Sequence, residues 1–338
     1  MPKALAAMAA LTVSLVVPVL GFAQETAASQ KSLAEQLVDA FTAVFGAHPG
    51  MRANHPKGVV LEGTFTPSAS AASVSKAAHL KKQKKPVPVT VRFSAGSGLP
   101  SVPDTNDMPR GMAVKFSLPD GSKTDMVVLS YNGFPVATAE EFRDFLLAIA
   151  SSGPDASKPT AIETFLSTHP AAKTFVETPK PPPVSYGTVA YFGINTFKFT
   201  NAKGATILGR YQLQPLAGAQ YLAKEQVSDK GPDYLTAEIH DRVHRGPITF
   251  KLLVQVAEAG DKIDDPTIAW PDTRKTIELG TIAITKAVAD SQAAEKKLLF
   301  VPGALTPGIE AADPMIAARS AAYIVSLSRR VQTNDKAK

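Results

Sequence analysis

The chain of 338 residues contains 36 Lys and Arg, 30 Asp and Glu and no Cys, and its formal net charge is +6. The lack of cysteine excludes a disulfide framework, thiolate catalysis and cysteine-ligated iron–sulfur clusters. A hydrophobic fraction of 44% suits a globular protein with a large core, and so mild a positive charge argues against a dedicated nucleic-acid-binding protein.

The first 23 residues have the organisation of a secretory signal peptide. Lys3 precedes a long apolar run, and the small residues Gly21 and Ala23 stand just before the predicted cleavage point. A membrane anchor is the alternative, since the run approaches spanning length, but Pro18 and the small-residue end favour cleavage. We therefore predict a periplasmic or secreted mature chain, residues 24–338, that is not stably inserted in a membrane and has a net charge of +5 after the loss of Lys3.

The first predicted element of the mature chain is a helix from about Leu33 to Gly46, which opens on a capping box, Ser32 to Glu35. Segments rich in Val, Thr and Phe between Gly, Pro or Asp then predict strands at 58–67, 87–96, 110–121 and 125–133. The lysine-rich run 81–85 is expected to be a solvated loop. A second capping box, Thr138 to Glu141, opens the next predicted helix, which ends at about Ala150.

In the second half, the proline-rich stretch 178–187 predicts a linker without regular structure. Four more strands are predicted, at 187–201, 205–215, 248–258 and 277–285. A helix is predicted over 232–246, and a last helix begins at Asp313, its cap, and Pro314. Because strands and helices do not alternate as βαβ units, the expected fold is α+β: a single domain built on an eight-stranded antiparallel β-barrel with inserted helices.

The last predicted helix carries two arginines and a tyrosine on an otherwise apolar stripe. At 100° per residue, Arg319 lies about 40° from Tyr323, and Arg330 lies about 20° to the other side. Nearby positive charge favours the phenolate form of a tyrosine, and a phenolate is one known axial ligand of haem iron. The alternative is a core tyrosine hydrogen-bonded to arginine.

Four short motifs occur in order along the chain: R-x-x-H-x-K-G at 52–58, V-R-F-S at 91–94, P-R-G-x-A-V-K-F at 109–116 and R-x-x-x-Y at 319–323. Together they resemble the haem catalase family. The small, exported chain looks like the catalase-related peroxidases of that family, and TIAWPDTRKTIELGTIAI and PGIEAADPM are similar to segments of the same branch. The resemblance extends from about residue 33 to residue 330.

The resemblance implies a haem b, bound in a pocket of the barrel, and a role for each motif arginine. Tyr323 would be the proximal ligand of the iron, with Arg319 as the partner that keeps its phenol ionised; the two lie one helical turn apart. Arg52, Arg92 and Arg330 would bind the haem propionates, since a guanidinium matches a carboxylate in bidentate geometry.

On the distal side the resemblance implies that His55 is the catalytic base and that Ser94 orients it. His55 would take a proton from one oxygen of the peroxide and deliver it to the other. Catalases also have a distal asparagine, but here an ungapped match puts Ser130 in its place, with Asn132 two positions away. A weakened distal donor favours peroxidase over catalase chemistry, with hydrogen peroxide or organic hydroperoxides as oxidants and a small organic reductant.

Two alternatives to a peroxidase remain at this stage: a non-catalytic haem-binding protein of the same fold, and an unrelated exported barrel. A zinc site is also conceivable, because His240 and His244 are spaced H-x-x-x-H on a predicted helix, but no third ligand accompanies them. His48, His79 and His169 are expected in solvated loops. The chain is expected to be a monomer or a small homo-oligomer.

Overall fold

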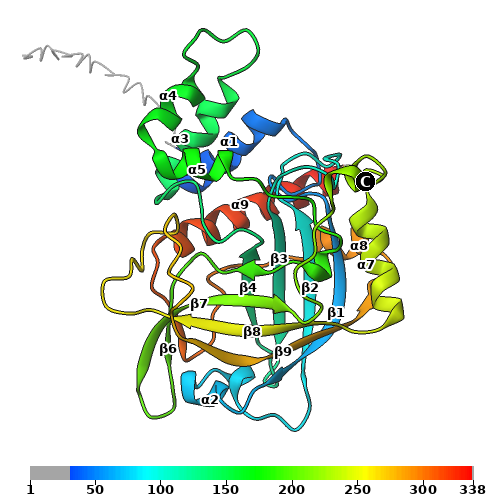
Figure 1. Ribbon diagram of the computed structural model, residues 1–338, viewed down its shortest axis with the longest axis vertical. Coiled ribbons are helices and arrows are strands. Elements are labelled where there is room, and N and C mark those ends of the chain that lie inside the picture. The colour runs from blue at the N-terminus through cyan, green and yellow to red at the C-terminus, as the bar shows by residue number, and fades with distance from the viewer. Residues whose placement is uncertain (1–30, 337–338) are drawn as a thin grey trace, which may run out of the picture. The chain divides into compact units, whose positions relative to one another are not determined.

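Eight antiparallel strands close into a barrel in the structure, a computed structural model in which residues 31–336 are described (Figure 1). The whole sheet in the described residues has ten strands: β1 (Gly58–Pro67), β2 (Val87–Ala95), β3 (Arg110–Ser117), β4 (Lys123–Leu129), β5 (Tyr191–Phe192), β6 (Phe197–Thr200), β7 (Thr206–Pro215), β8 (Ile248–Val256), β9 (Thr276–Ala287) and β10 (Ile309–Ala311). Around the barrel the order is β7-β5-β4-β3-β2-β1-β9-β8, and β8 pairs with β7 to close it. Strands β6 and β10 extend the sheet beside β7.

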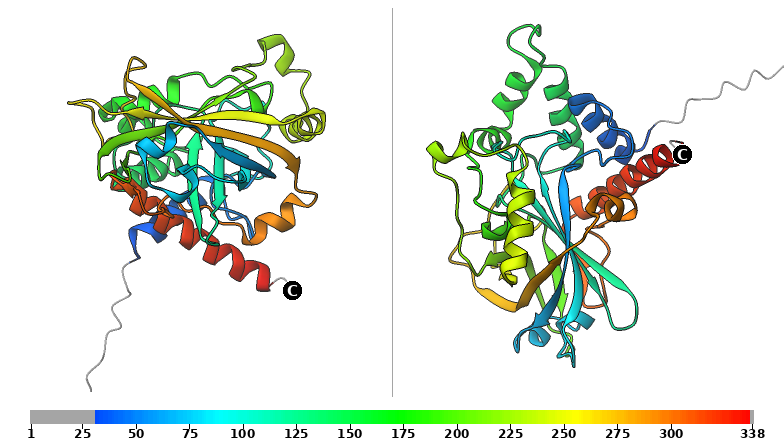
Figure 2. Two further views of the ribbon diagram at one scale, coloured as in Figure 1. Left: turned by 90° about the horizontal axis from the view of Figure 1, so that it is seen from below. Right: turned by 90° about the vertical axis from the view of Figure 1, so that its right-hand side faces the viewer.

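Helices gather at one end and along the outside of this barrel. They are α1 (Leu33–Phe45), α2 (Ala71–Val74), α3 (Ala139–Ala150), α4 (Ala161–Thr168), α5 (Pro170–Glu177), α6 (Lys224–Val227), α7 (Tyr234–Arg245), α8 (Ser291–Lys297) and α9 (Met315–Lys336), with 3-10 turns η1 (Ala78–Leu80) and η2 (Tyr186–Thr188). Helices α1, α3, α4 and α5 form a cap, and α9 passes beneath α1 (Figures 1 and 2). Within residues 31–336 no helix has both the length and the apolarity needed to cross a membrane.

The predicted fold class, an α+β fold on an eight-stranded antiparallel barrel, is confirmed. Both capping boxes form as predicted, at Ser32 and at Thr138. The predicted strand 187–201 is wrong as a single element, because it divides into η2, β5 and β6, and η2 also occupies the end of the predicted linker. The predicted signal peptide lies outside the described residues.

Strand alternation separates a core face from a site face on β2. Val91 and Phe93 have no exposed surface and lie in the barrel interior, where the ring of Phe93 stacks on Tyr186 with centroids 5.2 Å apart. Arg92 and Ser94 occupy the alternate positions and therefore point to the other face. The same strand thus fills the core and supplies two of the predicted site residues.

The prediction for His79 is wrong, because this residue lies in the core. His79 was expected in a solvated loop, but η1 places its ring in the core, 3% exposed, with Phe65 and Phe116 as aromatic neighbours.

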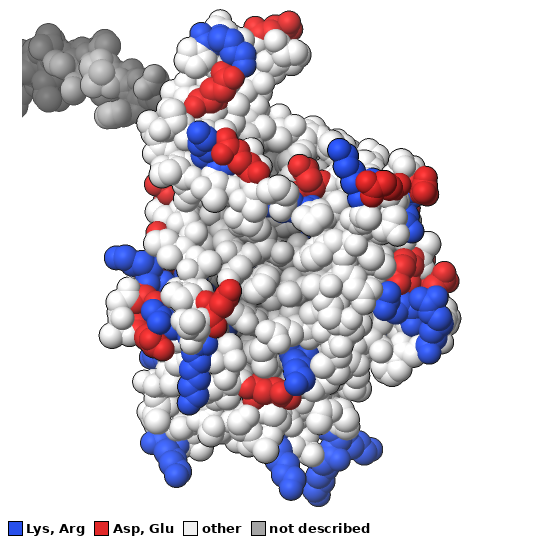
Figure 3. All heavy atoms as spheres, viewed as in Figure 1, with Lys and Arg blue, Asp and Glu red and all other residues white. Residues whose placement is uncertain are grey.

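The expectation for the lysine run is confirmed, because Lys81, Lys82, Lys84 and Lys85 are all exposed. Figure 3 shows Lys and Arg side chains gathered at the end of the molecule farthest from the helical cap.

Burial of His79 predicts a pH-dependent stability. Its pKa is lowered by desolvation from 6.5 to about 4, so its contribution to stability is fully present above pH 6.5 and is lost as the pH falls toward 4. The loss corresponds to about 3 kcal/mol of unfolding free energy. Replacement His79→Leu, of similar volume, should flatten the dependence of the denaturation midpoint on pH between 6.5 and 4.

The exposed His244 on α7 provides the control for this measurement. The variant His244→Leu should keep the pH dependence of the parent in the same thermal denaturation series. An equally steep dependence in His79→Leu would show that His79 does not carry this acid sensitivity.

Candidate active site

A cavity lies between the barrel and the helical cap, and its empty space, including the open mouth, is about 1270 Å³. Apolar side chains from the cap form much of its wall, among them Leu37, Phe41 and Phe142. Strands β2, β3 and β4 form another wall, and α9 supplies a third. All seven predicted site residues line this one cavity: Arg52, His55, Arg92, Ser94, Arg319, Tyr323 and Arg330.

On α9, the pair Arg319 and Tyr323 is part of a longer polar chain. Arg319 Nη2 donates to the Tyr323 hydroxyl at 3.3 Å, and Arg319 Nη1 donates to Asn195 Oδ1. Asn195 Nδ2 in turn donates to Asp313 Oδ2 at 2.6 Å, and the other oxygen of Asp313 accepts from the backbone N–H of Met315. The residue predicted as the helix cap therefore also fixes, through Asn195, the arginine that contacts the tyrosine.

His55 and Ser94 meet across the junction of the 52–57 loop and β2. His55 Nδ1 lies 3.0 Å from Ser94 Oγ, within hydrogen-bond distance. The register of β2 and β3 pairs Ser94 with Gly111, where an added Cβ would lie 2.7 Å from Ser94 Oγ and 3.1 Å from the imidazole ring. A glycine in the P-R-G motif is therefore a steric requirement of the His55–Ser94 contact.

The electrostatic environment of His55 disfavours its protonated form. Burial contributes most, and the positive charges of Arg92, Arg319 and Arg52 contribute further, so that the pKa of His55 falls to about 3. The imidazole is half-buried because part of its surface borders the cavity. At neutral pH the ring is consequently uncharged and able to accept a proton.

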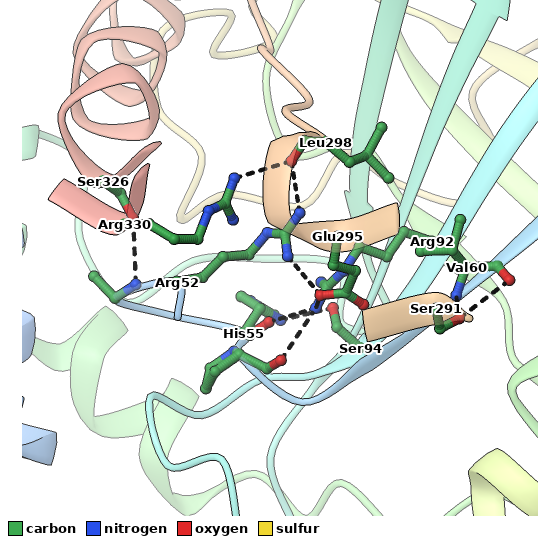
Figure 4. Close-up of polar contacts among 12 residues, drawn as sticks. Arg52, His55, Val60, Arg92, Ser94, Ser291, Glu295, Leu298, Ser326 and Arg330 are labelled. Atoms are coloured by element: carbon green, nitrogen blue, oxygen red, sulfur yellow. Dashed lines mark hydrogen bonds and ion pairs between the residues drawn. The ribbon is translucent and has the colours of Figure 1, made fainter. Parts of the chain in front are cut away.

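Three arginines converge near one end of the cavity (Figure 4). Arg52 and Arg92 both donate to Glu295 Oε2, at 2.5 and 3.0 Å, while Arg52 and Arg330 both donate to the carbonyl oxygen of Leu298. Burial first, and then the charge of Arg92, lower the pKa values of Arg52 and Arg330. With one carboxylate against three guanidiniums, the cluster has a surplus of positive charge.

The two candidates for the distal asparagine lie elsewhere. The Ser130 hydroxyl accepts from the backbone N–H of Arg110 at 2.8 Å and borders a smaller pocket of about 400 Å³. Neither Ser130 nor Asn132 is among the described residues that line the main cavity, whereas Leu129 is. The wall of the cavity beside β4 is therefore apolar at this point.

Sequence reasoning identified the motif residues but missed the residues that hold them. Asn195, Glu295 and the supporting role of Asp313 had no recognisable signal, because each acts across more than 100 positions of the chain. Gly111 lies within the quoted P-R-G motif, so its place beside Ser94 could have been read from the pairing of two adjacent strands.

The profile of the catalase family, described as "Catalase", matches residues 44–337. A catalase-related peroxidase of Mycolicibacterium paratuberculosis is 37% identical over 88% of this chain and 94% of that protein. One of Synechococcus elongatus is 31% identical over 96% of this chain and 95% of that protein. The fold is similar to that of a fungal catalase crystal structure, with a TM-score of 0.74 and 22% identity over 84% of this chain; the chain spans 60% of the length of that protein.

Haem is the cofactor of this family, and the donor set of the cavity fits it. Three guanidiniums and Glu295 leave a surplus of two positive charges, which matches the two carboxylates of a haem. Among the described residues, the buried Nε atoms of Arg92 and Arg330 have no hydrogen-bond partner. The apolar walls suit the macrocycle, and the Tyr323 oxygen is a hard ligand suited to ferric iron.

The hydrogen-bonded series Asp313, Asn195 and Arg319 ends at Tyr323, the predicted iron ligand. We therefore expect a change at Asn195 to affect haem binding through Arg319. Asn195→Ala should leave Arg319 without its acceptor and weaken haem binding by about tenfold, the usual effect of losing a hydrogen bond to a charged group. Tyr323→Phe should reduce haem content further and shift the Soret band. Haem content and absorption spectra of the purified variants would measure both effects.

Asn132→Ala provides the matched control, because Asn132 does not line the described cavity. Its haem content and spectrum should equal those of the parent. If Asn195→Ala behaves in the same way as this control, the polar chain behind Arg319 has no influence on the haem.

Proposed function

Because the chain belongs to the catalase family, we propose that it is a haem peroxidase that reduces hydrogen peroxide and organic hydroperoxides with a small organic electron donor. The observation that carries this proposal is the contact between His55 and Ser94 in the same cavity as Tyr323 and Arg319. A protein that only carried haem would need Tyr323 and the arginines but no base beside a serine.

In the proposed mechanism, bound haem supplies the redox chemistry, and the residues of the chain bind it and move protons. Tyr323 would ligate the iron through its oxygen, and Arg319, held by Asn195, would donate a hydrogen bond to that oxygen. Arg52, Arg92 and Arg330 would bind the propionates. The macrocycle would be haem b held without covalent bonds, since the chain has no cysteine for thioether attachment.

His55 would act as the proton shuttle of the reaction. When Nδ1–H donates to Ser94 Oγ, the lone pair of Nε2 is free to accept a proton from one oxygen of the peroxide. The low pKa of His55 means that the imidazolium form is a strong acid, so the proton passes on readily to the other oxygen, which leaves as water. Ser94 has a positioning role in this scheme.

The lining of the cavity supports a preference for peroxidase over catalase turnover. Catalase turnover requires a second peroxide molecule to be oriented as the reductant, and a distal amide would assist that step. Leu129 borders the cavity, while Ser130 and Asn132 are not among its described lining residues. Phe134 and Phe142, with ring centroids 4.8 Å apart, add an apolar surface suited to hydroperoxides with organic substituents and to aromatic donors.

We also propose that the protein acts outside the cytoplasm, on the basis of its first 23 residues. Expression of the full chain in a Gram-negative bacterium should yield a mature protein in the periplasmic fraction. Amino-terminal sequencing should begin at Gln24. A protein that retains Met1 in the soluble cytoplasmic fraction would contradict this proposal.

The test of the enzymatic function is the substitution His55→Asn. Asparagine tolerates the left-handed backbone conformation of this position, where φ is 57°, but cannot serve as the base. The haem should remain bound with a near-normal Soret band. Peroxide-dependent oxidation of an organic donor, and the change in Soret absorbance on mixing with hydrogen peroxide, should both slow by about a hundredfold or more.

His240→Asn is the matched control, since His240 lies on α7 and does not line the described cavity. Its rates should equal those of the parent. Parent-like rates in His55→Asn would exclude His55 as the base. A parent protein that binds haem but does not respond to peroxide would favour a non-catalytic haem-binding protein instead.

A further inference from the structure

Glu295 occupies an unusual position beside the site. It lies on α8, its side chain is 13% exposed, and it is not among the described residues that line the cavity. Its Oε2 atom accepts from two guanidiniums, Arg52 Nη1 at 2.5 Å and Arg92 Nη2 at 3.0 Å (Figure 4). A partly buried carboxylate shared by two arginines restricts the orientation of both.

The same Arg92 nitrogen that contacts Glu295 also contacts the backbone of His55. Arg92 Nη2 donates to the His55 carbonyl oxygen at 2.8 Å and approaches that of Pro56 at 3.4 Å. The guanidinium reaches this position by passing over Gly58, where an added Cβ would lie 2.4 Å from Nη2. One guanidinium therefore joins the α8 carboxylate to the peptide of the predicted base.

His55 is the position at which such a restraint matters. Its φ of 57° is the one positive value for a non-glycine residue in the described chain. A left-handed conformation in a non-glycine residue is strained and persists only where the surroundings enforce it. Three contacts hold the backbone of His55: its N–H donates to Ser97 O at 2.9 Å and to Asn54 Oδ1 at 3.0 Å, and its carbonyl oxygen accepts from Arg92.

The loop that carries His55 is fastened on both sides. After His55, Lys57 donates to the carbonyl oxygens of Val102 and Pro232 and pairs with Asp104 at 2.8 Å. Before it, Arg52 is fixed by Glu295. Glu295 is thus the one carboxylate, among the described residues, whose recorded ion pairs include both arginines that border this loop.

We infer that Glu295 is a positioning residue for His55, acting through Arg92 to hold the strained backbone that aims the imidazole into the cavity. The inference rests on the proposed role of His55 as the proton shuttle. It assigns to α8 a function in the reaction without contact with peroxide: the carboxylate sets the orientation of the guanidinium, and the guanidinium holds the peptide oxygen.

The test is Glu295→Gln in the haem-loaded protein, which keeps the size of the side chain but removes its charge. Hydrogen–deuterium exchange, measured by mass spectrometry, should be about tenfold faster in the peptide that covers residues 51–57, because the backbone restraint is weakened. The peptide that covers β8 should exchange as in the parent. The response of the Soret band to hydrogen peroxide should slow by about tenfold to a hundredfold, the cost of a misplaced catalytic group.

Glu238→Gln is the matched control, since Glu238 forms a comparable partly buried ion pair with Arg242, at 2.8 Å on α7 away from the cavity. It should leave both measurements unchanged. If Glu295→Gln does not fold, Glu295→Asp replaces it: the shorter carboxylate cannot reach both guanidiniums, and exchange at 51–57 should still rise at least threefold.

Unchanged exchange at residues 51–57 in a folded Glu295 variant would overturn the inference, including the case in which only the haem content falls. Faster exchange throughout the protein would also overturn it, because Glu295 would then stabilise the fold in general. A parent protein that does not respond to peroxide would refute the proposed function alone, because the exchange measurement would still decide whether Glu295 restrains His55.

Discussion

Positive charge held inside an apolar cavity is the constraint on which the site depends. Arg52, Arg92, Arg319 and Arg330 all border the cavity, and a buried guanidinium without acceptors is strongly destabilising. The protein supplies acceptors for only part of this positive charge: the carboxylate of Glu295 and several carbonyl and amide oxygens. The remaining charge favours an anionic ligand, and the proposed haem would offer its two carboxylates to Arg52, Arg92 and Arg330.

The same charge determines what kind of base His55 can be. Burial first, and then the charges of Arg92, Arg319 and Arg52, lower the pKa of His55 to about 3, so the imidazole does not retain a proton at neutral pH. A base of higher pKa would take the proton from peroxide more readily but would release it more slowly to the departing oxygen. In the proposed function, the arginines that would bind the haem therefore also favour rapid release of a proton from His55. Cofactor binding and proton transfer are linked through one electrostatic field.

How much of this architecture is visible in the sequence depends on the range of each interaction. Local rules sufficed for β1, whose bounds match the prediction because Gly58 and Pro67 delimit it, and for the capping boxes, whose partners lie three residues apart. The spacing of Arg319, Tyr323 and Arg330 on one helical face was visible for the same reason. By contrast, Glu295 meets Arg52 across 243 positions, and no local pattern distinguishes it from a surface glutamate. His79 was misjudged because the adjacent lysines suggested a solvated segment, whereas the turn η1 directs its ring into the core.

The end of β4 shows how a small backbone interaction can alter a catalytic wall. The Ser130 hydroxyl accepts a hydrogen bond from the backbone N–H of Arg110, and the backbone N–H of Ser130 donates to the Arg110 carbonyl oxygen. This reciprocal pair ties the serine to the neighbouring strand, and Leu129 borders the cavity instead. An apolar side chain there cannot orient a second peroxide molecule by hydrogen bonding, but it does not hinder an organic reductant that needs only apolar contact. The pairing of two strand ends thus leaves an apolar side chain at this wall of the cavity.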